Sequence, residues 1–110
     1  MFVFRDKLKK IDMGEGVIRQ YLGAGQNMNA QHWDMADQSV VKLHTHSQEQ
    51  FGYVIEGGFK MIIGEEVTVL KKGDAYFIPP NVPHEFTAIG QTEAIDIFSP
   101  VKTDFPWKDE

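Results

Sequence analysis

Two histidines, His44 and His46, stand one residue apart in a stretch whose composition favours a β-strand. Side chains repeat every two residues along a strand, so both imidazoles are expected on the same face. Imidazole nitrogen is the commonest metal-ligating group in proteins, and the pair therefore indicates a metal site. Two solvated histidines on an exposed strand would show the same spacing. A third histidine, His84, would complete the site if its strand lies against the first.

The fourth ligand can be one of two neighbouring residues. Gln50 lies four positions after His46, and even spacing returns it to the same strand face. Glu49 is the alternative, although alternation directs it to the opposite face. Gln50 could instead be a polar core residue, because amides are poorer ligands than carboxylates. His32, beside Trp33 and outside this pattern, is predicted to be a packed or surface histidine.

This ligand set predicts one divalent metal ion in an unusually cationic site. Three neutral imidazoles and a neutral amide leave the charge of the ion uncompensated by the protein, which favours a small anionic substrate and Lewis-acid chemistry. All four ligands are nitrogen or oxygen donors, so manganese, iron, nickel, cobalt and zinc remain open. The usual non-haem iron oxygenase site includes a carboxylate, so oxygen chemistry is less favoured.

The composition is that of an ordinary globular protein. The 110 residues carry 42% hydrophobic and 25% charged side chains, which predicts a single domain over residues 1–110. A net charge of −5 argues against nucleic acid and anionic membranes as partners. There are no cysteines, which excludes disulfides and thiolate zinc sites. The apolar start is too short for a signal-peptide core, and we expect a cytoplasmic protein.

The chain reads as short β-branched and aromatic runs separated by Gly, Asn, Asp and Pro. Without helices to support a parallel sheet, such runs predict an all-β antiparallel sandwich or small barrel. Residues 2–4 are expected to form an edge strand or to contact a neighbouring subunit. The tail after about residue 99 is irregular, and its Phe105 and Trp107 are expected to pack on the body or on a partner. Strands are predicted at 17–22, 28–35, 39–46, 52–56, 59–63, 66–70, 75–78, 85–88 and 93–98.

The spacing of these residues resembles that of the cupin family. The cupins, antiparallel double-stranded β-helix (jelly-roll) barrels with a metal inside, carry the motifs Gly-x5-His-x-His-x3-Glu-x6-Gly and Gly-x5-Pro-x-Gly-x2-His-x3-Asn. The chain departs from these motifs at Gln38, Gln50, Asn81 and Ala88, which replace Gly, Glu, Gly and Asn. The positions that match are His44, His46, Gly57, Gly73, Pro79 and His84.

Three segments look like those of the pectin-degradation (KdgF-like) cupins: residues 46–57, 73–84 and 96–100. This resemblance implies an enzyme that converts 4,5-unsaturated monouronates to their linear keto form, with the metal held by three His and one Gln. It also implies that Asp96 is the acid/base or substrate-orienting carboxylate and that Phe98 lines the pocket. An Arg of the family falls on Lys102, which keeps the charge but lacks the planar fork that grips a carboxylate.

Two tyrosines, Tyr53 and Tyr76, are candidate hydroxyl donors to the substrate if they face inward. For Asp96, the alternative is a carboxylate at the surface end of a strand. The overall hypothesis is a homodimeric, metal-dependent isomerase or lyase-like enzyme acting on small sugar acids. Two alternatives come from other classes: a non-catalytic module that binds a small ligand, and an iron or manganese dioxygenase.

Overall fold

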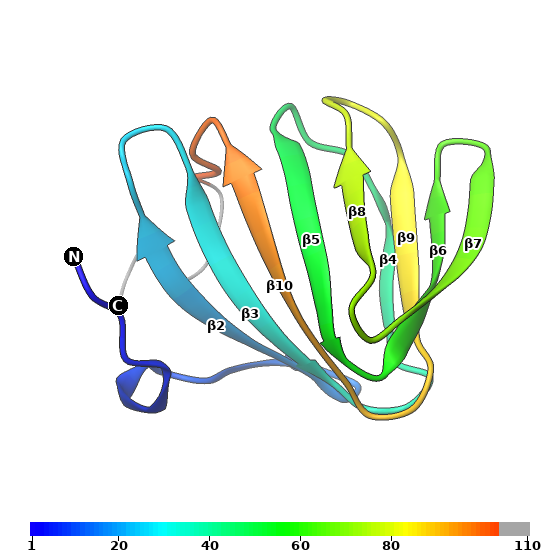
Figure 1. Cartoon of the computed structure of the whole chain (residues 1–110), viewed down its shortest axis with the longest axis horizontal. Coiled ribbons are helices and arrows are strands. Elements are labelled where there is room, and N and C mark those ends of the chain that lie inside the picture. Colours follow the sequence, from blue (N-terminus) through cyan, green and yellow to red (C-terminus); the bar gives the residue numbers. More distant parts are fainter. Residues whose placement is uncertain (104–110) are drawn as a thin grey trace.

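The computed structural model describes residues 1–103 of the chain and consists almost entirely of β-strands (Figure 1). One short 3-10 turn, η1, precedes them, and no α-helix occurs in the described part. Ten strands follow in chain order: β1 (Ile11–Gly14), β2 (Val17–Ala24), β3 (Asn29–Met35), β4 (Val40–His44), β5 (Glu49–Glu56), β6 (Gly58–Ile63), β7 (Glu66–Lys71), β8 (Ala75–Ile78), β9 (His84–Ala88) and β10 (Thr92–Ser99); η1 is Arg5–Lys7.

The strands form two antiparallel sheets that face each other. One has six strands in the order β1-β2-β3-β10-β5-β8, and the other has four in the order β4-β9-β6-β7. Strands distant in sequence are neighbours, as where β10 lies between β3 and β5 (Figure 1). This arrangement confirms the predicted all-β antiparallel jelly roll.

The hydrophobic core lies between the sheets at the end where β6, β8 and β9 meet the long strands. Its largest members include Phe59, Phe86 and Met35, all at most 1% exposed. Burial alternates along the long strands, as β5 shows with Gln50, Gly52 and Val54 inside and the residues between them facing outward. Towards the other end the interior becomes polar, and the candidate site lies there.

Most predicted strands are present within a few residues, with three differences at the N-terminal half. Residues 2–4 precede η1 and form no strand; the edge strand is β1, which the sequence analysis missed. The strand predicted at 39–46 ends at His44, so His46 lies in the following loop. Phe105 and Trp107 lie outside the described residues. No helix among residues 1–103 is long and apolar enough to cross a membrane.

Two positions that depart from the motif glycines keep a glycine-like backbone. Gln38 has a φ of +68° and Asn81 a φ of +65°, both in the left-handed region. Asn enters this region more easily than other residues with a Cβ, whereas Gln pays a steric cost there. The chain therefore keeps the local conformation of the motif at these two turns although it lacks the glycines.

Candidate metal centre and substrate cavity

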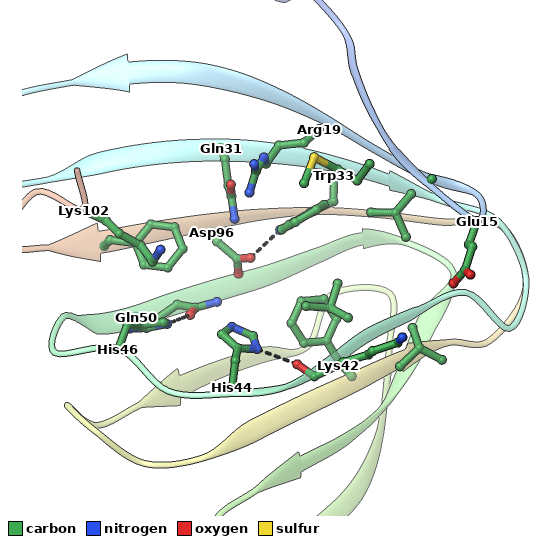
Figure 2. Close-up of a pocket in the computed structure, with 17 residues that line it drawn as sticks. Glu15, Arg19, Gln31, Trp33, Lys42, His44, His46, Gln50, Asp96 and Lys102 are labelled. Carbon is green, nitrogen blue, oxygen red and sulfur yellow. Dashed lines mark hydrogen bonds between the residues drawn. The ribbon is translucent and has the colours of Figure 1, made fainter. Parts of the chain in front are cut away.

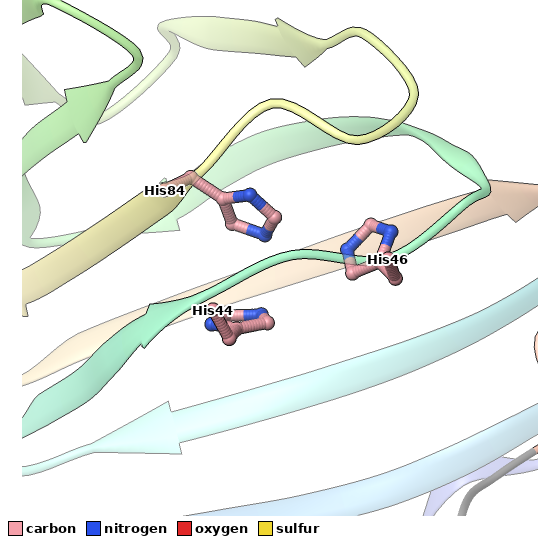
Figure 3. Close-up of side chains that lie close together, drawn as sticks. All are labelled: His44, His46 and His84. Atoms are coloured by element: carbon pink, nitrogen blue, oxygen red, sulfur yellow. The ribbon is translucent and has the colours of Figure 1, made fainter.

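Three histidines from three segments converge inside the polar end of the barrel (Figure 3). His44 ends β4 and is paired across the sheet with His84, the first residue of β9, and His46 follows in the loop after β4. The ring centroids of His44 and His84 lie 4.2 Å apart, and those of His46 and His84 lie 4.8 Å apart. Each ring offers one nitrogen within 4.8 Å of the others, so the three could hold a metal ion.

Backbone hydrogen bonds fix which nitrogen each ring can offer. Nδ1 lies near the carbonyl oxygen of a residue two positions away, at 2.7 Å for His44, 2.9 Å for His46 and 2.8 Å for His84. A carbonyl only accepts, so each Nδ1 carries a proton and donates it. In the neutral ring Nε2 then holds a lone pair, which is the tautomer that ligates a metal through Nε2.

The surroundings of Nε2 fit a cation. Nε2 of His84 is buried and has no hydrogen-bond partner among the described residues. Oε1 of Gln50 lies 3.0 Å from Nε2 of His46, although both atoms are acceptors once Nδ1 of His46 holds the proton. The amide nitrogen of Gln50 is committed to Asp96, which keeps Oε1 turned towards the histidines. A metal ion would satisfy all of these lone pairs together.

The neighbouring residue Glu49 is exposed and faces out of the barrel, whereas Gln50 is 3% exposed and faces inward. Of the two alternatives for a fourth ligand, the geometry therefore favours Gln50.

Desolvation favours the neutral form of two of these histidines, His46 and His84. The pKa of His84 is lowered to about 4, mainly by burial and also by the charges of His44, His46 and Lys102, against a hydrogen bond that raises it. Burial also lowers the pKa of His46. Neutral imidazole is the form that binds a metal, so these shifts keep the site ready to bind below neutral pH.

Asp96, deep inside the barrel, lies in a row of inward-facing residues that crosses four strands. It is paired with Gly52 on β5 and with Gln31 on β3, and Gly52 is paired with Tyr76 on β8. The Tyr76 ring lies over Gly52, where a Cβ would come 2.0 Å from its Cζ. Because Gly52 has no side chain, the Tyr76 hydroxyl reaches across it and donates to Oδ1 of Asp96 at 2.6 Å.

Four donors surround the Asp96 carboxylate, which is completely buried. Trp33 Nε1 donates to Oδ2 at 2.6 Å, and the amides of Gln31 and Gln50 also donate, in addition to Tyr76. Burial raises the pKa of Asp96, while these hydrogen bonds oppose the rise. Asp96 is therefore an interior group held in a fixed orientation, and the alternative of a surface carboxylate is wrong.

A cavity of about 740 Å³ opens beside these groups (Figure 2). Cationic side chains line it from three directions: Arg19 on β2, Lys42 on β4, and Lys102 after β10. The carboxylates that line it are Glu15 and Asp96. The chain has a net charge of −5, yet its cavity has more cationic than anionic side chains, and a bound metal would add to the positive charge.

A family model described as a cupin domain matches residues 31–98. The chain belongs to the cupins. It is 29% identical over 96 residues to the pectin degradation protein KdgF of Dickeya dadantii, which covers 86% of this chain and 87% of that protein.

Solved cupin structures superpose closely on this chain. An RmlC-like cupin from Shewanella frigidimarina has a TM-score of 0.89 at 33% identity, covering 94% of each chain. KdgF from a Halomonas species has a TM-score of 0.87 at 26% identity, covering 94% of this chain and 96% of that one. The predicted resemblance to KdgF-like cupins is thereby confirmed.

Phe98 and Lys102 both line the cavity of this cupin. The Lys102 backbone is clamped by the side-chain amide of Asn29, which accepts from Lys102 N at 3.0 Å and donates to Lys102 O at 2.7 Å. Its ammonium lies 6.0 Å from the centre of the Phe98 ring. The Phe98 ring in turn contacts His46, at 5.4 Å between centroids.

The two tyrosines are placed differently. Tyr53 is 40% exposed on the outer face of β5, so the expectation that it lines the pocket is corrected. Tyr53 lies three positions after the inward-facing Gln50, and residues an odd number of positions apart on one strand face opposite sides of the sheet. Tyr76 is buried and faces inward. Its hydroxyl donates to Asp96, but its side chain does not line the cavity.

Among the cavity residues that the sequence did not predict are Arg19, Gln31 and Trp33. They lie on β2 and β3, which carry no motif. One signal was available, because Arg19 shares a strand face with the apolar Val17 and a charged residue at an inward position suggests a site.

A second cluster of metal-ligating types lies on the outer side of the six-stranded sheet, formed by His32, Asp34 and Glu93. His32 is 3% exposed and its Nε2 lies 2.6 Å from Glu93. Nη1 of Arg5 lies 2.9 Å from His32, 3.3 Å from Glu93 and 3.8 Å from Asp34. The guanidinium occupies the place of a cation, so this cluster anchors the N-terminal segment, and His32 is a packed histidine as expected.

Proposed function

We propose that this cupin is a metal-dependent enzyme that converts 4,5-unsaturated monouronates to their linear keto form. The observation that carries the proposal is the convergence of three histidines and Gln50 in a cavity lined by cationic side chains. Such a site favours a small anion. The similarity to a pectin degradation protein over most of both chains supports a sugar acid as that anion.

His44, His46 and His84 would hold the metal through Nε2, with Gln50 as the fourth ligand through Oε1. When bound, a divalent ion would supply Lewis-acid stabilisation of negative charge on a substrate oxygen. The donor set contains no carboxylate, which makes the dioxygenase alternative less favoured. Manganese, iron, nickel, cobalt and zinc all remain compatible with it.

The proposed reaction is an isomerisation that needs no co-reactant. The hemiacetal hydroxyl loses a proton, the bond between carbon 1 and the ring oxygen breaks to leave an aldehyde and an enolate, and the enolate gains a proton at carbon 4 as it becomes a ketone. Asp96 is the side chain we assign to this proton movement. Burial raises its pKa and so makes its carboxylate a stronger base, while Tyr76 and Trp33 hold its orientation.

Phe98 and Lys102 complete the proposed site. The Phe98 ring covers His46 and excludes water from that side, and Lys102 adds positive charge close to the histidines. Exclusion of water strengthens each electrostatic contact inside the cavity.

The test is the loss of the ultraviolet absorbance of the conjugated double bond when the metal-loaded protein is mixed with an unsaturated monouronate. We expect a rate well above the spontaneous one and a fall of about 10²-fold or more in kcat for Asp96→Asn. Asp74→Asn, in an exposed turn, is the matched control and is expected to keep full activity. A parent rate equal to the spontaneous rate contradicts the proposal.

The same samples separate the alternatives. Tight binding of the uronate without turnover, unchanged by Asp96→Asn, would instead indicate a binding module. Oxygen uptake that depends on Fe(II) would indicate a dioxygenase.

We also propose that this cupin is a homodimer that pairs through the outer face of its six-stranded sheet. Phe77 is 74% exposed there, and its ring contacts that of Phe51 in a tilted arrangement with 5.0 Å between centroids. Tyr53 and the aromatic residues of the N-terminal segment are also exposed. A surface of this kind is rare on monomers, and a second copy offers a matching apolar face. Light scattering should give twice the chain mass for the parent and one chain mass for Phe77→Glu. A monomeric parent protein contradicts the proposed dimer.

A cytoplasmic location remains a prediction.

A further inference from the structure

Arg19 is a buried cation in the wall of the cavity, away from the proposed metal ligands. It projects inward from β2, is 6% exposed, and holds its guanidinium carbon 5.4 Å from the centre of the Trp33 ring. Stacking on an aromatic ring leaves the guanidinium edges available for hydrogen bonds in the ring plane. The guanidinium has five N–H donors, so it can bind a ligand while it keeps contacts with neighbouring residues.

Gln31, on the adjacent strand, supplies an acceptor at the same wall. Its amide nitrogen donates to Asp96, which fixes the orientation of the side chain. Its Oε1 is buried and has no hydrogen-bond partner among the described residues. A buried acceptor without a partner costs free energy, and a hydroxyl group of a ligand in the cavity would satisfy it.

The two walls of the cavity therefore carry different chemistry. Figure 2 shows Arg19 and Gln31 on the wall formed by β2 and β3, His44 and His46 on the opposite wall, and Asp96 between them. Lys102 belongs to the histidine side, since its ammonium lies 6.0 Å from the centre of the Phe98 ring, which contacts His46. A molecule that reaches from the histidines to Arg19 must pass Asp96.

We propose that Arg19 grips the carboxylate of the substrate through its planar fork while Gln31 Oε1 accepts a hydrogen bond from a substrate hydroxyl. The inference rests on the proposed function and assigns its substrate-recognition groups. A carboxylate and a hydroxyl on one small molecule define a hydroxy acid, which is the class to which monouronates belong. The guanidinium supplies the bidentate grip that Lys102 cannot, and Lys102 contributes charge near the histidines.

The test uses galacturonate, a saturated and unreactive monouronate, with neutral galactose as its matched ligand. Trp33 reports binding because it lies under Arg19; Trp107→Phe leaves it as the single tryptophan. We expect galacturonate to bind at least tenfold more tightly than galactose. Arg19→Lys should weaken galacturonate binding about tenfold and Arg19→Gln about 10- to 100-fold, the range for hydrogen bonds to a charged group. Neither variant should change galactose binding.

Lys60→Gln, at an exposed position of β6, is the control for loss of a positive charge far from the cavity and should bind like the parent. If Arg19→Gln does not fold, the proposal can still be tested with the unmodified protein by comparing its affinity for galacturonate with that for the methyl ester. Equal affinities would overturn the proposal. Unchanged galacturonate affinity in Arg19→Gln, with a loss in Lys102→Gln, would also overturn it.

Failure of this proposal and failure of the proposed function give different experimental results. Binding of galacturonate that depends on Arg19, in a protein without activity on unsaturated monouronates, would keep the recognition site and remove the reaction. Activity on unsaturated monouronates that Arg19→Gln leaves unchanged would keep the reaction and remove the recognition site.

Discussion

Gly52 is the position where the structure makes the sharpest prediction about stability. A Cβ at this residue would lie 2.0 Å from Cζ, 2.2 Å from Cε2 and 2.3 Å from the hydroxyl oxygen of Tyr76. Real Cβ atoms do not approach other heavy atoms so closely, so Gly52→Ala must displace the Tyr76 ring. The ring cannot move without breaking the hydrogen bond from its hydroxyl to Asp96.

The cost has two parts. Forcing the ring out of a packed interior costs about 1–3 kcal/mol, and loss of a buried hydrogen bond to a carboxylate costs about 1–3 kcal/mol. Together they predict that Gly52→Ala lowers the free energy of unfolding by about 2–6 kcal/mol, a large part of the 5–15 kcal/mol typical of a small domain. An ordinary Gly→Ala change in a strand would be neutral or slightly stabilising, because alanine reduces the entropy of the unfolded chain.

Urea denaturation followed by circular dichroism measures this difference, with Gly25→Ala as the matched control. A Cβ at Gly25 would meet its nearest neighbour at 3.8 Å, an ordinary contact, so that variant should stay within about 0.5 kcal/mol of the parent. In a Tyr76→Leu background the ring atoms are gone, and Gly52→Ala should then cost little. An equal cost of Gly52→Ala in both backgrounds would refute the argument that Tyr76 is the obstacle.

Three further predictions concern the histidines and the left-handed turns. His84→Ala should abolish stoichiometric metal, as measured by elemental analysis of protein purified without chelators or a His tag; retained metal would place the site elsewhere. In the metal-free protein, the pKa of His84 is about 4 when folded and near 6.5 when unfolded, so the unfolded state binds more protons between these values. Stability should therefore fall as pH drops from about 6.5 to 4, by up to about 3 kcal/mol, and urea titrations should show this loss diminished in His84→Gln. Gln38→Gly should raise the free energy of unfolding by about 1 kcal/mol, and Asn81→Gly by less, because Asn tolerates a positive φ; a destabilised Gln38→Gly would contradict the strain assigned to that turn.

The strands could be predicted wherever they alternate and are bounded by turn residues. β1 escaped prediction because only its first residue is even partly buried, so no alternation of apolar residues marks it. The prediction that the strand continues to His46 was wrong for another reason. The strand ends at His44, and the His46 ring is directed into the site by its hydrogen bond to a loop carbonyl, a feature that strand periodicity does not contain.

The candidate metal ligands could be proposed from spacing because all four fall within two short motifs. Tyr53 could have been excluded by the same alternation that excluded Glu49, since both are an odd number of residues from Gln50. Arg19 and Gln31 are different, because their position at the site depends on β3 pairing with β10, more than 60 residues away in sequence. That register is decided by packing of the whole sheet and is not visible in a local pattern.

The distribution of charged groups implies that an anionic substrate would be recognised inside the cavity and not by long-range attraction to the surface. A chain with a net charge of −5 repels a small anion at long range, and salt screens this repulsion beyond about 8 Å at physiological ionic strength. Attraction must therefore come from groups that contact the ligand in a partly desolvated space, where Coulomb interactions are stronger than in water. Arg19 meets this condition on one wall, and the histidines, with a metal, meet it on the other. Asp96, between the two, has its charge offset by four hydrogen-bond donors, so a carboxylate substrate can pass it without facing an uncompensated negative charge.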